Sequence, residues 1–179
     1  MTHLLALYNR AATSVSRQSD WLLPSLARLV FAGVLTGYFW SSAATKLDGP
    51  FSPTAGAYAQ IFPRLFEAVG YDQAQLGLFH WAVALAGAWA EFVLPALIVL
   101  GFFTRLAALG MAGFVLVQSM TDVFGHGAKA GAWFDRASDA LILDQRAFWM
   151  LLLVVLVLKG AGPLSIDRLF PKVTVRLPA

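Results

Sequence analysis

Four long apolar stretches, separated by polar segments, dominate the pattern of this chain. They run from about residue 21 to 44, from 76 to 103, from 106 to 124 and from 145 to 158. An α-helix needs about 20 apolar residues to cross the hydrocarbon core of a bilayer. The short fourth stretch reaches that length if residues 141–143 extend it across Asp144. The pattern therefore predicts an all-α, polytopic membrane protein built as a bundle of four transmembrane helices.

The ends of these helices are marked by glycine, proline and charge. One helix over residues 76–124 would be roughly 75 Å long, more than twice the thickness of the hydrocarbon core. A turn is therefore required, and Gly101 followed by Arg105 places it at residues 101–105. After the fourth stretch, Gly160, Gly162 and Pro163 are expected to end the helix.

Two loops connect the spans on the membrane side opposite the chain termini, and both are long enough to carry structure of their own. In residues 58–69 an apolar stripe recurs at helical spacing, which predicts a helix lying in the membrane interface or packed on the protein's own surface. Pro63 is expected to kink or split that helix. Residues 125–140 are glycine-rich around His126 and then carry Trp133 and Phe134. This second loop is either a functional cover or a solvated connector.

The distribution of charge predicts the orientation. Residues 1–8 are too short for the apolar part of a signal peptide and residues 10–20 form a polar linker, so the first span is expected to stay as an anchor. Seven Lys or Arg residues flank the spans on the side of the termini and five on the other. This bias favours a cytoplasmic N-terminal segment (1–20), a transmembrane domain (21–170) and a cytoplasmic tail (171–179).

Composition excludes several classes of protein. The chain is 59% hydrophobic and 13% charged, against roughly 25% charged residues in soluble domains. Its net charge of +3 comes from Lys and Arg at segment ends without a basic patch, so no nucleic acid is expected as a partner. The absence of cysteine excludes dithiol chemistry by this chain alone and an iron–sulfur cluster held on thiolates. Only His80 lies within a span, so no pair of histidines is available for haem.

One charged residue lies deep inside each of the first two apolar stretches, Arg28 in the first and Glu91 in the second. A charge at that depth is costly unless it is paired, and it often marks a functional site. Arg28 and Glu91 lie at similar depths when residues are counted from the membrane boundary on the side of the termini. An Arg28–Glu91 ion pair is therefore predicted. The pair either serves function or only holds the two spans in register.

A second polar group is expected at the ends of the spans that face the long loops. Gln118 and Asp122 are four residues apart and share a helix face. The full group consists of Lys46, His80, Gln118, Asp122, Asp144 and Gln145. It predicts a polar mouth above an apolar bundle, with ordinary interfacial polarity as the alternative. His80, His126 and Asp122 could supply a set of zinc ligands, but their spacing is not diagnostic, so no metal site is predicted. Gly33 and Gly37 fit a GxxxG pattern, which favours packing inside the bundle over dimerisation.

Three motifs resemble the DoxX family. They are Arg28 with Gly33, Gly37 and Lys46; residues 90–95 (AEFVLP) with 100–108 (LGFFTRLAA); and residues 160–167 (GAGPLSID). The resemblance covers about residues 21–170 and is weakest at 125–147. It implies a four-helix bacterial inner-membrane protein, related to the DoxD subunit of thiosulfate:quinone oxidoreductase and to membrane partners of thiol-stress and metal-stress systems. The family is functionally mixed, so the resemblance does not imply a substrate.

Together these observations favour a quinone-reactive membrane subunit of a periplasm-facing oxidoreductase system. Quinone is the expected cofactor, because an apolar bundle with a polar mouth suits its ring oxygens and its tail. The expected partners are the bilayer and a periplasmic or membrane redox protein, with a homo-oligomer left open. The alternative is a non-catalytic scaffold or a carrier for small solutes or metals. Catalytic roles are assigned to His80, Asp122 and Glu91, and quinone binding to Arg28, Lys46, His80, Gln118, Asp144 and Gln145.

Overall fold

The computed structural model describes residues 2–170, and four helices in this part are long and apolar enough to cross a membrane. They are His3–Ala44, Leu78–Leu100, Thr104–Gly125 and Leu141–Lys159. The prediction of an all-α, polytopic membrane protein is confirmed, including the extension of the fourth span across Asp144. The predicted tail, residues 171–179, lies outside the described residues.

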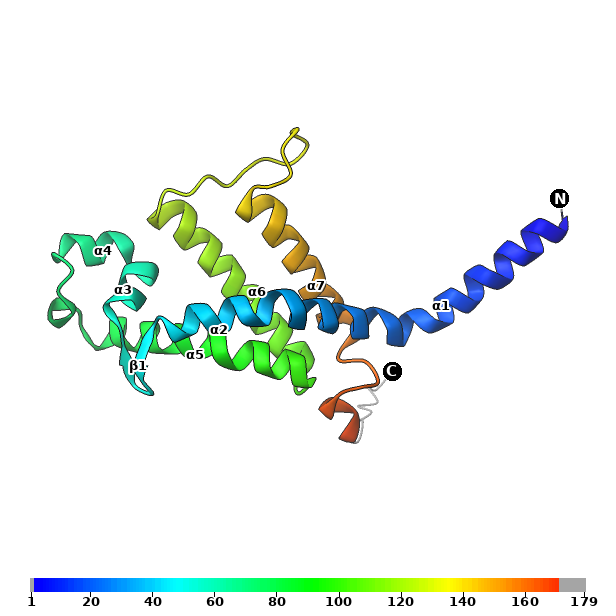
Figure 1. Ribbon diagram of the computed structural model, residues 1–179, viewed down its shortest axis with the longest axis horizontal. Helices are drawn as coiled ribbons and strands as arrows, with labels where there is room; N and C mark the ends of the chain where they lie inside the picture. The colour runs from blue at the N-terminus through cyan, green and yellow to red at the C-terminus, as the bar shows by residue number, and fades with distance from the viewer. Residues whose placement is uncertain (1, 171–179) are drawn as a thin grey trace, which may run out of the picture.

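Short π-helical and 3-10 turns (η) interrupt or extend the α-helices, and one small β-hairpin lies in the first loop (Figure 1). The elements follow the order α1 (Thr2–Phe31), η1 (Ala32–Thr36), α2 (Gly37–Ala44), β1 (Leu47–Gly49), β2 (Ser52–Pro53), α3 (Ala55–Ile61), α4 (Pro63–Ala68), η2 (Gln73–Gln75), α5 (Leu78–Leu100), α6 (Thr104–Met120), η3 (Thr121–Gly125), η4 (Leu141–Gln145), α7 (Arg146–Lys159) and η5 (Ile166–Leu169). We call the end of the bundle near residues 45–77 and 125–140 the loop end, and the end near the 101–103 turn the terminal end.

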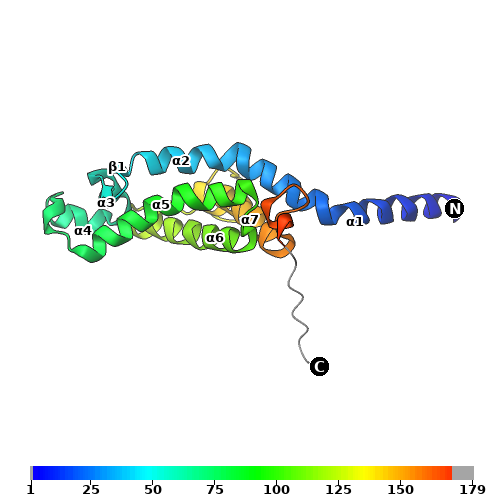
Figure 2. The same cartoon turned by 90° about the horizontal axis from the view of Figure 1, so that it is seen from below.

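The first helix is longer than predicted. Residues 10–20 form part of α1, so the prediction of a polar linker is wrong. This segment contains good helix formers and neither glycine nor proline before Pro24, so nothing in the sequence stops the helix. The first part of α1 extends away from the bundle in both views (Figures 1 and 2).

Each span packs against two others around one apolar core. The helices α5 and α7 both contact α6, α1 contacts α7, and α2 contacts α5. Their shared core is made of fully buried side chains, among them Phe31, Leu35, Phe39, Ile98, Met111, Leu153 and Leu156. Gly33 and Gly37 are exposed, and a Cβ on either would meet nothing within 4 Å. The GxxxG pattern does not pack inside the bundle, so that prediction is wrong.

The predicted turn between the second and third spans is confirmed at Gly101. Its φ of +68° is left-handed, and a Cβ there would lie 2.5 Å from the Cβ of Ser165. Glycine is therefore required by both conformation and space. The Asp167 carboxylate accepts hydrogen bonds from the backbone N–H of Phe103 at 2.7 Å and of Thr104 at 2.9 Å, which caps α6. The segment after α7 thus closes the terminal end of the bundle.

The first loop forms the predicted helix as two pieces, α3 and α4, split at Pro63 as expected. Ala57, Tyr58 and Phe66 are buried in a cluster with Ala84 of α5. The pieces therefore pack on the protein itself, which was one of the two alternatives. Burial raises the pKa of the Tyr58 phenol above its ordinary value. This cover fixes the loop end of α5, where the candidate site begins.

Candidate functional site: a polar cavity between α5 and α6

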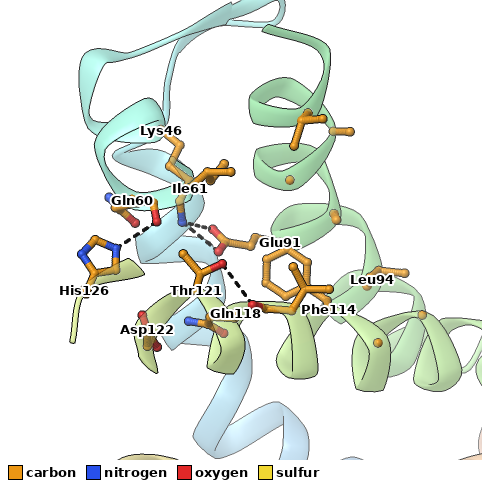
Figure 3. A pocket seen from close by; sticks show the side chains of 17 residues that line it. Lys46, Gln60, Ile61, Glu91, Leu94, Phe114, Gln118, Thr121, Asp122 and His126 are labelled. Atoms are coloured by element: carbon orange, nitrogen blue, oxygen red, sulfur yellow. Dashed lines mark hydrogen bonds and ion pairs between the residues drawn. The ribbon is translucent and has the colours of Figure 1, made fainter. Parts of the chain in front are cut away.

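A cavity of about 450 Å³ lies between the facing sides of α5 and α6. These two helices diverge from their turn toward the loop end (Figure 1), where α3 and the end of α2 cover the space between them (Figure 3). The lining residues are Lys46, Gln60, Ile61, Val83, Ala86, Gly87, Ala90, Glu91, Leu94, Gly110, Gly113, Phe114, Val117, Gln118, Thr121, Asp122 and His126. Four of the predicted site residues therefore meet at one cavity: Lys46, Glu91, Gln118 and Asp122.

Glu91 forms a buried ion pair with Lys46. The Lys46 ammonium lies 2.8 and 2.7 Å from the two carboxylate oxygens and also donates to Ser42 Oγ at 2.6 Å. Lys46 is 4% exposed and Glu91 2% exposed. Lys46 follows directly after α2, and its long side chain reaches inward to the carboxylate, as Figure 3 shows. The pair neutralises both charges at a depth where water cannot screen them.

The predicted Arg28–Glu91 pair is wrong. Arg28 lies at the terminal end and donates to four backbone carbonyls, those of Ile98, Val99, Ala161 and Leu164. The last carbonyls of a helix have no partner within that helix. Arg28 satisfies two of them at the end of α5 and joins them to the segment after α7. Depth in the membrane was the only basis of the predicted pair, and it does not show that backbone carbonyls can bind Arg28 in place of the Glu91 carboxylate.

A second ion pair at the loop end joins α6 to α7. Arg146 Nη2 donates to Asp122 Oδ2 at 2.6 Å, and Nη1 donates to Ser119 Oγ at 2.9 Å. The Arg146 side chain is 3% exposed and that of Asp122 25%. The guanidinium carbon also lies 5.8 Å from the centre of the Trp149 ring. In the sequence, Arg146 was interpreted only as a charge that flanks the fourth span. Arg146 and Trp149 are three residues apart and share a helix face, and this spacing was the available signal that Arg146 points inward.

Gln118 offers the cavity an acceptor without a partner. Its Nε2 donates to the Tyr38 hydroxyl at 3.1 Å, whereas its buried Oε1 has no hydrogen-bond partner among residues 2–170. A buried acceptor left unpaired costs free energy until a ligand or water supplies a donor. Gln118 Oε1 is therefore the group that most directly points to a ligand with an O–H or N–H.

The histidines are arranged differently from the prediction. His80 does not line the cavity; its ring lies 5.1 Å from that of Phe62 and 5.6 Å from that of Phe79. His126, which the site prediction left out, lines it, with Nε2 3.0 Å from the Gln60 carbonyl oxygen. Within the described residues there is no group of three or more His, Cys, Asp or Glu side chains that could hold a metal ion.

Two further predicted residues remain outside the cavity. Asp144 Oδ2 accepts a hydrogen bond from the Ala140 backbone N–H at 2.9 Å, so it caps the start of the fourth span. Gln145 is exposed beside it. The start of the fourth span therefore supplies no residue to the cavity lining, and its Arg146 reaches the site only through the ion pair with Asp122.

The rest of the cavity is apolar and lined with small residues. A Cβ on Gly87 would meet Ile61 at 3.3 Å and one on Gly110 would meet Leu94 at 3.3 Å, but a Cβ on Gly113 would meet nothing within 4 Å. Gly110 and Gly113 are exposed on the spanning part of α6, and Val117 is 63% exposed. The site thus combines two internally neutral ion pairs and an amide with an apolar wall, which suits an uncharged ligand with a few polar oxygens.

A comparison with protein families matches this region to a known family. The model of the family described as DoxX matches residues 23–127. All the residues that line the cavity fall within that range, whereas Arg146 and the fourth span lie outside it. Searches among curated proteins and among solved structures found no match.

Proposed function

This chain belongs to the DoxX family, and on that premise we propose that its cavity between α5 and α6 binds a membrane quinone. The protein then acts as the quinone-reactive subunit of an oxidoreductase system, and a partner on the side of the long loops presents the reductant. A thiol pair or another sulfur compound is the class of donor that fits the family. The observation that carries the proposal is the unpartnered Gln118 Oε1 at the polar end of an otherwise apolar cavity within the membrane.

The shape and lining of the cavity fit a quinone head group. Its volume of about 450 Å³ falls within the range of roughly 300–1,000 Å³ common for small-molecule sites. Phe114 and Leu94 offer apolar surface to a flat ring, and the exposed side of α6 at Gly113 and Val117 leaves room for a tail that extends into lipid. The site needs no cysteine, flavin or haem of its own.

The residues of the cavity have distinct roles in this proposal. A bound quinone would supply the capacity to accept two electrons and two protons. Gln118 Oε1 would accept a hydrogen bond from the reduced ring hydroxyl. Lys46 would donate to a ring oxygen in place of Ser42 Oγ, while Glu91 holds its ammonium in position. Asp122 lies nearer the aqueous end and is partly exposed, so it is placed to exchange protons with water.

The proposal is tested by extracting lipids from gently purified protein and chromatographing them for quinone. Gly113→Leu should fill the cavity without displacing a neighbour and should lose most of the bound quinone. Gly37→Leu is the matched control, because Gly37 is equally open but lies away from the cavity. Equal quinone in both variants would contradict the proposed site. Stoichiometric partner protein without quinone would favour the scaffold alternative.

We also propose that the protein lies in a bacterial inner membrane with both termini in the cytoplasm. The support is the excess of Lys and Arg near the terminal end. Single cysteines introduced as Asp72→Cys and Lys129→Cys should react with an impermeant reagent from outside intact cells, whereas Lys172→Cys should not. Labelling at position 172 from outside would reverse the orientation.

A further inference from the structure

A second cavity, of about 750 Å³, lies at the terminal end of the bundle. Its lining residues come from α1, the start of α6, the end of α7 and the segment that leads from α7 through η5. We propose that this cavity binds the phosphate group of an anionic phospholipid. The inference is independent of the quinone proposal, because the two cavities share no lining residue.

The cavity contains more positive charge than its own carboxylates neutralise. Arg105, Lys159 and Arg168 line it together with Asp20 and Asp167. Asp20 pairs with Lys159 at 2.7 Å, and the carboxylate of Asp167 is occupied by the two backbone N–H groups that begin α6. Within residues 2–170, Arg105 makes no side-chain hydrogen bond or ion pair, and Arg168 makes only a 3.4 Å contact with a carbonyl. Two guanidinium groups are therefore available for an anion.

A buried hydroxyl adds an unused donor to the same cavity. Thr104 lines it and is 0% exposed, and its Oγ1 has no hydrogen-bond partner in the described part of the chain. The backbone N–H groups at the start of α6 are not the basis of the site, because they already donate hydrogen bonds to the Asp167 carboxylate. A phosphate has oxygens enough to accept from a hydroxyl and from guanidinium groups together, and arginine matches it in a bidentate geometry.

The position and the apolar rim indicate a lipid in preference to free phosphate. Arg105 and Lys159 lie at the ends of two membrane-spanning helices, which is the depth of the phospholipid head groups. Three large apolar side chains line the cavity with a substantial exposed fraction: Trp21 (48%), Phe103 (57%) and Leu106 (67%). Acyl chains would cover this surface, whereas an inorganic anion would leave it in contact with water.

The experiment measures lipid retained by the full-length protein in nanodiscs, by native mass spectrometry. Wild-type protein should retain phosphatidylglycerol in preference to phosphatidylcholine. The double variant Arg105→Gln/Arg168→Gln should lower that retention on the order of ten- to thirty-fold, because each basic residue near the surface contributes to attraction of anionic lipid. The variant Arg10→Gln/Arg17→Gln removes the same charge from α1, outside the cavity, and should retain phosphatidylglycerol as the wild type does.

Three results would overturn the proposal. One is equal loss in both double variants, which would show nonspecific attraction. Another is equal retention of the two lipids by the wild type. The third is displacement of the retained lipid by inorganic phosphate at millimolar concentration, which would indicate a site for the free anion. Thr104→Val, whose backbone and size are nearly unchanged, provides a second variant and should lower retention without removing charge.

Discussion

The two ends of the bundle bury charge in different ways. At the loop end, ionic side chains pair with one another: Lys46 with Glu91, and Arg146 with Asp122. At the terminal end, Arg28 and Asp167 bind backbone groups instead, four carbonyls in one case and two N–H groups in the other. The first arrangement borders a cavity between α5 and α6, whereas the second closes the turn and the segment after α7.

The difference determines what can be replaced. Two side chains that satisfy each other can both be made neutral, and nothing polar is then left behind. Backbone carbonyls cannot be removed, so Arg28 has no partner whose substitution would compensate for its loss. We therefore expect the ion pairs at the loop end to tolerate paired changes, and the Arg28 contacts at the terminal end to tolerate none. Three measurements test this contrast.

The largest expected effect is at the Lys46–Glu91 pair. Lys46→Met leaves a buried carboxylate without its cation and should lower the free energy of unfolding by about 3–5 kcal/mol. Lys46→Met/Glu91→Gln should recover a large part of that loss, since neither charge remains. Unfolding of purified protein in detergent provides the measurement. If the double variant loses the sum of the two single losses, the residues are not coupled.

A smaller loss, about 3 kcal/mol, is expected for Arg28→Met, because hydrogen bonds from a charged donor to several carbonyls disappear together. Combining it with Glu91→Gln should give additive losses, because the two residues belong to different ends. Arg28→Lys is the control for charge: it keeps the cation but lacks the planar fork, so it should recover only part of the stability. Coupling between Arg28 and Glu91 would contradict the structure.

The smallest effect on stability is expected at the second pair. Asp122→Asn should cost about 1–2 kcal/mol, because the new amide oxygen and the Ser119 hydroxyl can both still accept hydrogen bonds from the buried Arg146 guanidinium. Quinone retention or reduction should nevertheless fall, because Asp122 lines the cavity. Asp144→Asn is the matched control, and as it lies outside the cavity it should leave quinone unaffected. A larger loss of quinone retention in Asp144→Asn than in Asp122→Asn would argue against a role for Asp122.

Much of the fold was predictable because it depends on local pattern and length. The spans follow from apolar runs, the turn at Gly101 from a glycine near a charge, and the split in the first loop from Pro63. The error at residues 10–20 arose because a polar sequence was taken to be non-helical, although helix formation depends on the backbone and not on polarity. The GxxxG pattern of Gly33 and Gly37 was also misleading, because the motif alone does not show whether its helix face points into the bundle or away from it.

The candidate site was predictable in its members but not in its contacts. Four of its residues were identified because charged or amide side chains, inside the spans or at their ends, are few in so apolar a chain. His80 was placed with them because it lies on the same helix as Glu91, yet its ring packs among aromatic side chains of the first loop and of its own helix. Arg146 was missed because a charge at the end of a span is expected to face water.

The sequence by itself determined the membrane class, the four spans, the turn positions and the need to neutralise Glu91. Each of these depends on residues near one another along the chain. Only the tertiary structure decided which cation meets Glu91. Arg28 lies at the terminal end of the first span, and it is Lys46, just after the other end of that span, that reaches the carboxylate. Backbone carbonyls at the end of α5 and after α7 bind Arg28, and the carboxylate pairs with Lys46 at the other end. The packing of the helices decides that backbone carbonyls bind Arg28 and that Lys46 binds Glu91. The same packing creates the cavity between α5 and α6.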